Sequence, residues 1–240
     1  MERQRIDLYG VAIDDVTVTE AVGRVLDGSG EGELVFTPNA KMLMRCRKEP
    51  KYADLLNRAT LSLPDGAGVL LAAKRKGTPL RERVAGIELA EALLCEAAKR
   101  GMRVFFLGGK QGVAERAAER LCRQYEGLRV CGFHDGYFEK QGEENRRLLG
   151  LINAARTEVL FVCFGFPMQE EWLVQNLSLL PSVRIALGLG GSLDVFAGDV
   201  RRAPKMLSRF KLEWLWRMLR EPKRLRDLPE LIRFFLLAPN

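Results

Sequence analysis

The sequence predicts an α/β fold in which a mostly parallel sheet is flanked by helices and followed by a basic, amphipathic helical appendage. Short apolar runs alternate with longer amphipathic stretches through residues 1–198. The short runs are apolar on both faces, which is typical of strands buried between two layers of helices. Charge separates the appendage, residues 199–240, from this body: residues 201–240 hold 11 Lys and Arg against 4 Asp and Glu, whereas the first 200 residues hold 27 of each kind.

Six runs are candidate strands: ELVFTPN, LSLPDG, RVFFLGG, LRVCGF, EVLFVCFG and RIALGLGG, in chain order. Amphipathic stretches such as 86–100 and 112–125 are the expected helices between them. Strands that alternate with helices predict a Rossmann-like sheet, in which ligands bind beyond the carboxyl ends of the strands. A polar or glycine-rich cluster follows every one of the six runs, so we expect six loops to converge on one edge.

These loops supply the candidate binding residues of the body: Thr37, Asn39, Asp65, Gly108, Gly109, Asp135, Gly136, Tyr137, Phe138, Gln169, Gly190, Gly191 and Asp194. FFLGGKQG and GLGGSLD each pass from a strand through glycines into a helix, where backbone N–H groups can face an anion. Two such turns in one sheet favour a nucleotide ligand. Tight turns alone would also require glycines, and the complete GxGxxG and GxxxxGK[ST] spacings are absent.

Asp65 in LSLPDGAG has two local interpretations. A carboxylate at a strand end can accept a proton as general base, but it can equally cap the helix expected from Gly66, and the local sequence favours the cap. Thr37 and Asn39 admit the same turn and cap roles ahead of a helix at Lys41. Arg81 and Arg83 precede another helix, where guanidinium groups can bind a phosphate or simply be solvated.

Several classes of site are disfavoured by composition. The five cysteines form no CxxC pair and His134 is the only histidine, so a Cys/His metal site is not expected. The stretch MERQRIDLYG lacks the apolar core of a signal peptide, and no run approaches the ~20 apolar residues that cross a bilayer. We therefore expect a cytosolic protein that touches a membrane without spanning it.

The appendage combines positive charge with aromatic side chains. Leu207, Phe210, Trp214 and Met218 recur at helical spacing, with Arg209, Glu213, Arg217 and Arg220 on another side. Such a helix is too apolar to stand alone in water, so it must dock on the body, on another subunit or on lipid. Cations beside Trp and Phe are typical of a surface that binds anionic headgroups; a core helix with a solvated basic face is the alternative.

The motifs together resemble the WecG/TagA/CpsF family of bacterial N-acetylmannosaminyltransferases. The resemblance covers nearly the whole chain and is carried by TPNAKML, LPDGAGV, RVAGIEL, FFLGGKQG, FHDGYF, GFPMQEEW, GLGGSLDVFAG, RRAP and EWLWRMLREPKRLR. It implies inverting transfer of an amino sugar from a UDP-sugar to undecaprenyl-diphosphate-linked N-acetylglucosamine at the cytoplasmic face of the membrane. The enzymes of the teichoic acid linkage unit, which use UDP-N-acetylmannosamine and the acceptor 4-hydroxyl, are the most similar type.

The resemblance also implies residue roles. Asp65 becomes the base that deprotonates the acceptor hydroxyl, and Arg83 stabilises phosphate charge. Thr37, Asn39 and Gln169 line the sugar pocket, whereas 135–138 and 190–194 hold uridine, with the Gly108–Gly109 turn nearby. Four arginines of the appendage are expected to bind headgroups or the acceptor diphosphate: Arg217, Arg220, Arg224 and Arg226.

The sequence contains no DxD motif, the aspartate pair that commonly brings a divalent cation to a nucleotide sugar. We therefore expect transfer without a metal and without a cofactor, in which arginines and helix N-termini replace the cation.

Other functions remain open. Another UDP-sugar, or a lipid-linked acceptor of capsule, exopolysaccharide or common-antigen synthesis, would use the same residues. A dinucleotide-dependent oxidoreductase is disfavoured by the incomplete glycine pattern. Nucleic-acid binding, suggested by a pI near 9.3, is disfavoured by the neutral body. The apolar appendage is compatible with homo-oligomers when no membrane is present.

Overall fold

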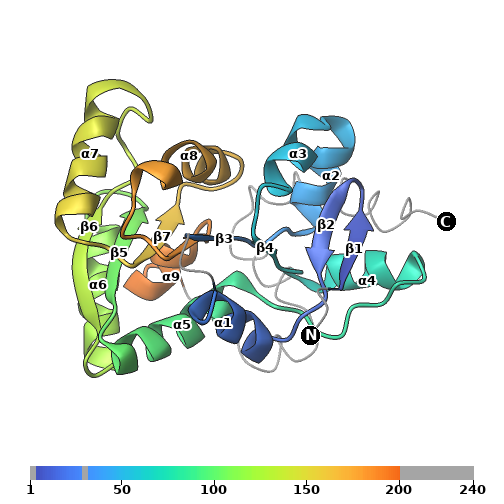
Figure 1. Ribbon diagram of the computed structural model, residues 1–240, viewed down its shortest axis with the longest axis horizontal. Coiled ribbons are helices and arrows are strands. Elements are labelled where there is room, and N and C mark those ends of the chain that lie inside the picture. The colour runs from blue at the N-terminus through green and yellow to red at the C-terminus, as the bar shows by residue number, and fades with distance from the viewer. Residues whose placement is uncertain (1–3, 29–31, 201–240) are drawn as a thin grey trace.

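The computed structural model describes residues 4–28 and 32–200, and its centre is a six-stranded, all-parallel sheet (Figure 1). Its strands are β3 (Glu33–Phe36), β4 (Leu61–Ser62), β5 (Arg103–Gly108), β6 (Arg129–His134), β7 (Val159–Cys163) and β8 (Ile185–Gly188). They lie in the order β4-β3-β8-β7-β5-β6, and all five neighbouring pairs are parallel. Each of the six predicted runs forms a strand, which confirms the predicted α/β fold.

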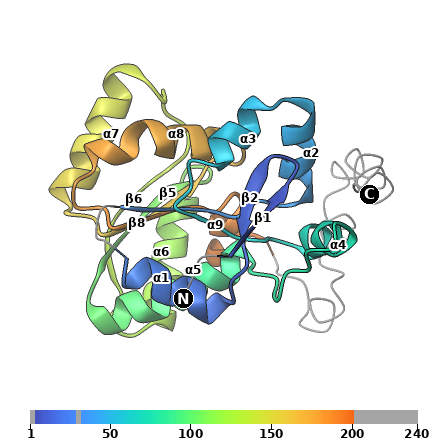
Figure 2. The same cartoon turned by 45° about the vertical axis from the view of Figure 1, so that its right-hand side comes forward.

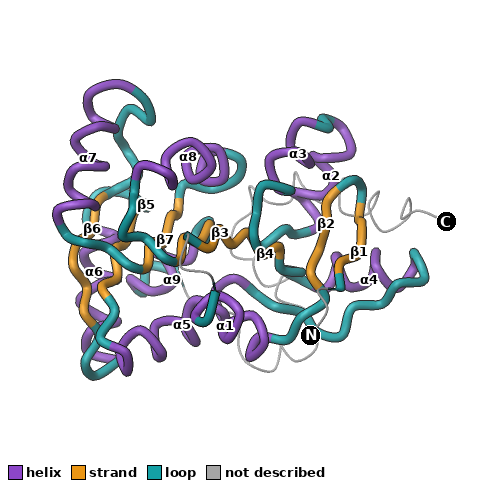
Figure 3. The backbone as a smooth tube through the Cα atoms, viewed as in Figure 1, coloured by secondary structure: helices purple, strands orange, loops and turns teal. Residues whose placement is uncertain are grey.

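Helices cover both faces of the sheet (Figures 1 and 3). They are α1 (Val18–Leu26), α2 (Ala40–Lys48), α3 (Lys51–Leu56), α4 (Ala67–Arg75), α5 (Gly86–Arg100), α6 (Val113–Gln124), α7 (Gly142–Ala154), α8 (Met168–Asn176) and α9 (Ser192–Ala197), with a 3-10 turn, η1 (Leu177–Leu179). The helix predicted at 86–100 is observed as α5, with the same bounds. For the predicted helix 112–125, the two end residues are the caps of α6, because Gly112 adopts the left-handed φ of 77° just before the first turn.

Side chains of the central strands alternate between two hydrophobic layers. In β7, Val159 and Phe161 pack with α1, α5, α6 and α9, whereas Leu160 and Val162 pack with helices of the opposite face. All four side chains are at most 1% exposed. A parallel strand that is buried on both faces needs a continuous run of apolar residues. These strands can therefore be predicted from the sequence.

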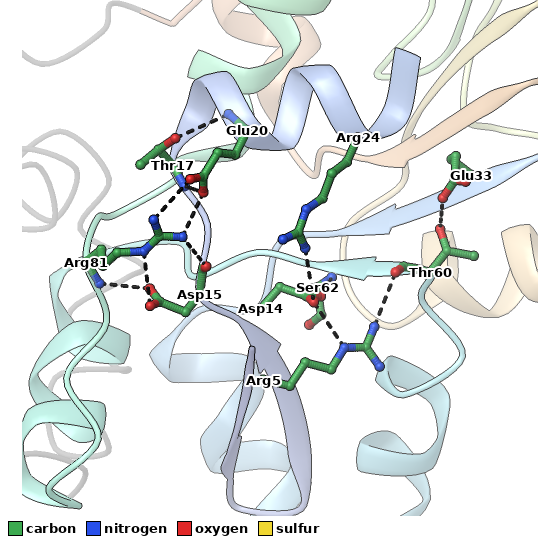
Figure 4. Close-up of polar contacts among 10 residues, drawn as sticks. All are labelled: Arg5, Asp14, Asp15, Thr17, Glu20, Arg24, Glu33, Thr60, Ser62 and Arg81. Atoms are coloured by element: carbon green, nitrogen blue, oxygen red, sulfur yellow. Dashed lines mark hydrogen bonds and ion pairs between the residues drawn. The ribbon is translucent and has the colours of Figure 1, made fainter. Parts of the chain in front are cut away.

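An antiparallel hairpin, β1 (Arg5–Leu8) and β2 (Val11–Asp14), lies outside the six predicted runs. Its two-residue turn places Tyr9 and Gly10 at φ of 58° and 82°, the left-handed region that tight hairpin turns require. The buried carboxylate of Asp14 accepts hydrogen bonds from Arg5 Nε at 3.0 Å and from the Ser62 amide at 2.8 Å. This carboxylate therefore joins the hairpin to the end of β4 (Figure 4).

Arg81 is held by acidic side chains of the fold, and its binding of a phosphate stays a prediction. Its Nε donates to Asp15 Oδ2 at 3.1 Å, and its Nη2 donates to Glu20 Oε2 at 2.7 Å (Figure 4). Glu20 also accepts from the Thr17 amide in the capping box of α1. Hydrogen bonding to Arg81 lowers the pKa of Glu20, as expected for a carboxylate held by a guanidinium.

None of the helices in 4–28 and 32–200 combines the length and the apolar character needed to cross a bilayer. Residues 201–240 lie outside the described residues. All but the first two residues of the predicted appendage, 199–240, are therefore not described, and neither are the four arginines named for it.

Candidate functional site

The loops that follow the strands meet at one edge because all six strands point the same way. The chain leaves β5 through α6 toward β6, but it leaves the neighbouring β7 through α8 toward β8, on the opposite side. Such a divergence opens the carboxyl edge of a parallel sheet and is where ligands bind in folds of this type.

The loop that carries Asp65 is bonded to its neighbours on both sides. The Asp65 amide donates to Pro38 O at 3.0 Å, and the Val84 amide donates to Pro64 O at 3.0 Å. The first bond joins this loop to the Thr37–Asn39 loop, and the second joins it to the segment that carries Arg83, which lies in the long connection between α4 and α5 (Figure 3). The structure thus brings four predicted site residues together.

Asp65 does not cap α4, so the local cap interpretation is wrong. The N-cap of this helix is Gly66, which has no side-chain cap bond, and its φ of 97° suits glycine. Asp65 is half-buried at the end of the β4 loop. Asp65 is therefore placed at the carboxyl edge of the sheet, one position before the cap of the helix.

Asn39 does cap its helix, as the structural alternative predicted. Its Oδ1 accepts from the Lys41 amide at 3.1 Å and from the Met42 amide at 3.2 Å, at the start of α2. A contact between Asn39 and a substrate would thus come from the NH2 group. Thr37 is 9% exposed, and a Cβ on Gly86 would lie 3.0 Å from its Oγ1, so Thr37 packs directly on the start of α5.

Arg83 reaches the same region with its charge compensated. Its Nη2 donates to Glu88 Oε1 at 2.6 Å, and the Arg83 side chain is 18% exposed. Glu88 lies in the first turn of α5, so the ion pair holds the guanidinium near the amino end of that helix. Both the guanidinium and the helix N-terminus favour an anion at this place.

The glycine turn after β5 is shaped by close approach to β7. Gly108 has a φ of 134°, and a Cβ on it would overlap the Cys163 carbonyl group. The Gly109 amide donates to Cys163 O at 3.3 Å, and Gly109 O accepts from the Gly136 amide at 2.9 Å. Loops after β5, β6 and β7 are thereby joined through backbone atoms, which confirms that these glycines make a tight turn and leaves their ligand role a prediction.

The segment after β6 presents aromatic rings. Asp135 Oδ1 accepts from the Tyr137 amide at 2.8 Å, and the Tyr137 side chain is 75% exposed. Phe138 lies 5.7 Å from the Phe164 ring, edge to face. Lys140 Nζ sits 3.6 Å from the Phe138 ring centroid and donates to Gly136 O at 2.6 Å. Burial lowers the pKa of Lys140, and sequence reasoning missed this cation because only the fold reveals its rings.

Gln169 joins the two central loops. Its Oε1 accepts from the Gly165 amide at 3.1 Å, after β7, and from the Gly190 amide at 2.8 Å, after β8. The residue is 4% exposed, and its Nε2 donates to Glu170 Oε1 at 2.8 Å. Gln169 is thus at the predicted edge, where it holds loops together in the described structure.

Glu170 is the principal residue that sequence reasoning missed. Its side chain is completely buried, and its Oε2 has no hydrogen-bond partner. Burial raises the pKa of Glu170 to about 7. The signal in the sequence is weak, because Glu170 and the exposed Glu171 are adjacent and chemically identical.

Along the edge, the site divides into two ends joined by the Gln169 bridge. The β4 and β3 end holds Asp65, Thr37, Asn39 and Arg83, and the β5 and β6 end holds the glycine turn and residues 135–138. The β8 loop, with Gly191 and with Asp194 in the first turn of α9, lies between them. Within 4–28 and 32–200, no three His, Cys, Asp or Glu residues gather as a metal site would require.

Known proteins resemble this chain over most of its length. A model of the glycosyl transferase WecG/TagA/CpsF family matches residues 6–239. A protein from Bacillus spizizenii is 37% identical over 82% of this chain and 75% of its own length. A Bacillus subtilis protein is 32% identical over 83% of this chain and 77% of its own length, and one from Staphylococcus aureus is 31% identical over 92% and 87%.

All three relatives are named N-acetylglucosaminyldiphosphoundecaprenol N-acetyl-β-D-mannosaminyltransferase. The match of the family model extends from within β1, through every loop of the candidate site, to residue 239. This chain therefore belongs to the WecG/TagA/CpsF family of glycosyltransferases.

Proposed function

We propose that this enzyme transfers N-acetylmannosamine from UDP-N-acetylmannosamine to the 4-hydroxyl of undecaprenyl-diphosphate-linked N-acetylglucosamine, with inversion at the anomeric carbon. The names of the relatives support the acceptor and the sugar, and their β product requires inversion if the donor is the α-linked UDP-sugar. A role in assembling the linkage unit of wall teichoic acid fits this reaction.

The observation that carries the proposal is the pair of backbone hydrogen bonds around Asp65. Each is 3.0 Å long, and together they tie the backbone of the Asp65 loop to the Thr37–Asn39 loop and to the Arg83 segment. A general base must lie within hydrogen-bond reach of the proton that it accepts. A loop fixed between polar residues and an arginine gives Asp65 a defined place for an acceptor hydroxyl.

In this mechanism Asp65 accepts the proton of the acceptor hydroxyl while the oxygen attacks the anomeric carbon. The bond from that carbon to the β-phosphate oxygen breaks, and UDP leaves with the electron pair. Arg83 and the amino end of α5 stabilise the departing diphosphate, a kind of preorganised support that contributes several kcal/mol in enzymes (about 3 kcal/mol per donor). The glycine turn and residues 135–138 hold the nucleotide.

The acceptor in this proposal is anchored in lipid, so the enzyme must work at a membrane surface. We place it at the inner face of the cell membrane, bound peripherally, with the basic appendage as one contact. Arg217, Arg220, Arg224 and Arg226 would bind headgroups or the acceptor diphosphate. Homo-oligomers away from the membrane are part of the same proposal, because they would cover the apolar side chains of the appendage.

The deciding experiment is UDP release from UDP-N-acetylmannosamine with and without a lipid-diphosphate N-acetylglucosamine acceptor. We expect acceptor-dependent release that falls by at least about 100-fold in Asp65→Asn, within the range that positioned bases contribute. Asp54→Asn, which removes the same charge from an exposed position on α3, is the matched control and should keep full activity. Release that survives in Asp65→Asn would remove Asp65 from the role of base, and no release from any UDP-sugar would reject the transferase reaction itself.

A further inference from the structure

Positive charge in the described body is concentrated in one segment. Residues 40–76 hold nine Lys and Arg against three Asp and Glu, whereas the other described residues hold 17 against 22. The body is therefore nearly neutral as a whole but carries +6 on the segment that forms α2, α3, β4 and α4. Neither α2 nor α4 contains an acidic residue.

The cations of α2 and α4 are on one end of the molecule. In Figures 1 and 2 both helices lie beside the β1–β2 hairpin, at the right-hand end of the molecule. The Arg47 guanidinium on α2 lies 5.9 Å from the Tyr9 ring centroid at the tip of the hairpin. Positive charge from both Arg47 and Arg75 acts on the Tyr9 phenol, so both guanidinium groups lie near the tip of the hairpin.

We define the basic face as the exposed side chains Lys41, Arg47 and Lys48 of α2 together with Lys74 and Arg75 of α4. Leu71 on α4 adds an apolar side chain that is 36% exposed, one helical turn before Lys74 and Arg75. Cations around an apolar side chain are typical of helices that lie on a lipid surface, where the long stems of Lys and Arg reach the headgroups.

We propose that the basic face of α2 and α4 docks on the headgroups of an anionic membrane, as a second contact that is separate from the C-terminal appendage. Charge complementarity favours lipid as the occupant. The appendage itself carries +7, so like charge opposes its binding to this face. The same charge argument opposes a second copy of the basic face.

The basic face also adjoins the reaction site. Helix α2 begins directly after its cap Asn39, and α4 begins two residues after Asp65, so both helices lead from the loops around the proposed base. Docking through their exposed cations would bring that edge of the sheet close to an acceptor that stays in the bilayer. This consequence rests on the proposed function, whereas the docking itself does not.

Two charge-reversal variants of the full chain test the proposal. Lys48→Glu with Lys74→Glu changes the basic face, and Arg123→Glu with Arg147→Glu makes the same change in net charge on α6 and α7. Arg123 and Arg147 are exposed, with side chains 73% and 74% accessible, at the opposite end of the molecule. Thermal unfolding should first confirm that both variants are folded.

Binding is measured by co-sedimentation with vesicles of phosphatidylglycerol and with vesicles of phosphatidylcholine alone. We expect the basic-face variant to lose at least about tenfold in affinity for the anionic vesicles, since each cation near such a surface contributes measurably, and the control variant to bind like the parent chain. Equal losses in both variants would mean that only net charge matters and would overturn the proposal. Unchanged binding of the basic-face variant would also overturn it, whether or not its self-association changes.

Catalysis gives a separate measurement. With a water-soluble acceptor analogue, the basic-face variant should transfer sugar at the parental rate, and with an acceptor embedded in anionic vesicles its rate should fall. If the parent chain transfers sugar to neither acceptor, the proposed function fails while the vesicle measurement still decides the docking surface.

Discussion

At the residue scale, Glu170 shows how the fold changes the chemistry of an ordinary side chain. A carboxyl group taken out of water is disfavoured in its charged form, so its proton is held to a higher pH. Burial raises the pKa of Glu170 to about 7, and the hydrogen bond from Gln169 Nε2 offsets this rise only in part. This group therefore titrates in the range where the enzyme is expected to work.

The titration of Glu170 predicts a pH dependence of stability. The native state keeps this proton up to about pH 7, whereas the unfolded chain loses it near the ordinary value of 4.5. The contribution of Glu170 to the free energy of unfolding is thus fully present below pH 4.5 and is lost as the pH rises through 7, by about 3 kcal/mol in total. Glu170→Gln removes the titration, so urea unfolding should show the variant gaining on the parent chain by this amount between pH 4 and pH 9.

The exposed neighbour provides the control for that measurement. Glu171→Gln deletes the same kind of carboxyl one position along α8, and the stability of that variant should follow the parental pH dependence. Parallel curves for the parent chain and Glu170→Gln would show that the buried carboxyl does not change its ionisation on folding.

The roles of single residues were the hardest feature to predict from the sequence. Asp65 and Asn39 are both small polar residues just after a strand, yet only Asn39 caps its helix. The choice depends on where the first turn begins relative to the loop, which is set by bonds such as that from the Asp65 amide to Pro38. The partners of Arg81 lie near the start of the chain, so its structural role could not be inferred from its own neighbourhood.

At the element scale, the glycine turn after β5 is fixed by backbone contact and leads to a prediction on stability. Gly108→Ala would force an L side chain to a φ of 134° and against the Cys163 carbonyl group. We expect a loss of about 2 kcal/mol or more in the free energy of unfolding, the cost of a strained backbone position. Chemical denaturation of the variant measures it.

A substitution at a second glycine, Gly150, is the control for Gly108→Ala. Gly150 lies in the exposed part of α7, and a Cβ there would meet no atom within 4 Å. Gly150→Ala should therefore stabilise the protein by up to about 1 kcal/mol, because alanine favours the helix over the unfolded chain. A loss of stability in both variants would refute the distinction between the two positions.

Strands and helices of the large sheet were predictable because their periodicity is a local property. Buried strands such as β5 and β7 are continuous apolar runs, and α5 has its predicted bounds. The β1–β2 hairpin was not predicted because RIDL and VAID are only four residues long and each contains at least one charged residue. Its position also depends on Asp14 reaching Ser62 across the fold. Convergence of the loops at one edge followed from the parallel topology alone.

At the scale of the whole molecule, the proposed chemistry is independent of divalent cations. Arg83 and the start of α5 supply positive charge where the diphosphate is expected. We predict that transfer continues at the full rate after dialysis against EDTA, measured as acceptor-dependent UDP release. Complete loss of activity that Mg²⁺ or Mn²⁺ restores would contradict this prediction.

The distribution of charge predicts that removal of residues 201–240 weakens but does not abolish vesicle binding. The deletion removes +7 of charge and the aromatic residues beside it, while the basic face remains. Co-sedimentation of the truncated chain with anionic vesicles should show reduced affinity. Binding equal to that of the full chain would exclude the appendage as a membrane contact.

The Gln169 bridge has a consequence for motion at the edge of the sheet. The side-chain oxygen of Gln169 accepts hydrogen bonds from the Gly165 and Gly190 amides, so a single acceptor holds the loops after β7 and β8. Rotation of the Gln169 side chain would expose both amides to solvent at once. Hydrogen exchange at these two positions, which are distant in sequence, should therefore be governed by one local opening event. The two loops at this edge would then loosen and tighten as a unit, and the buried Glu170 carboxyl is bonded to the other end of the same amide.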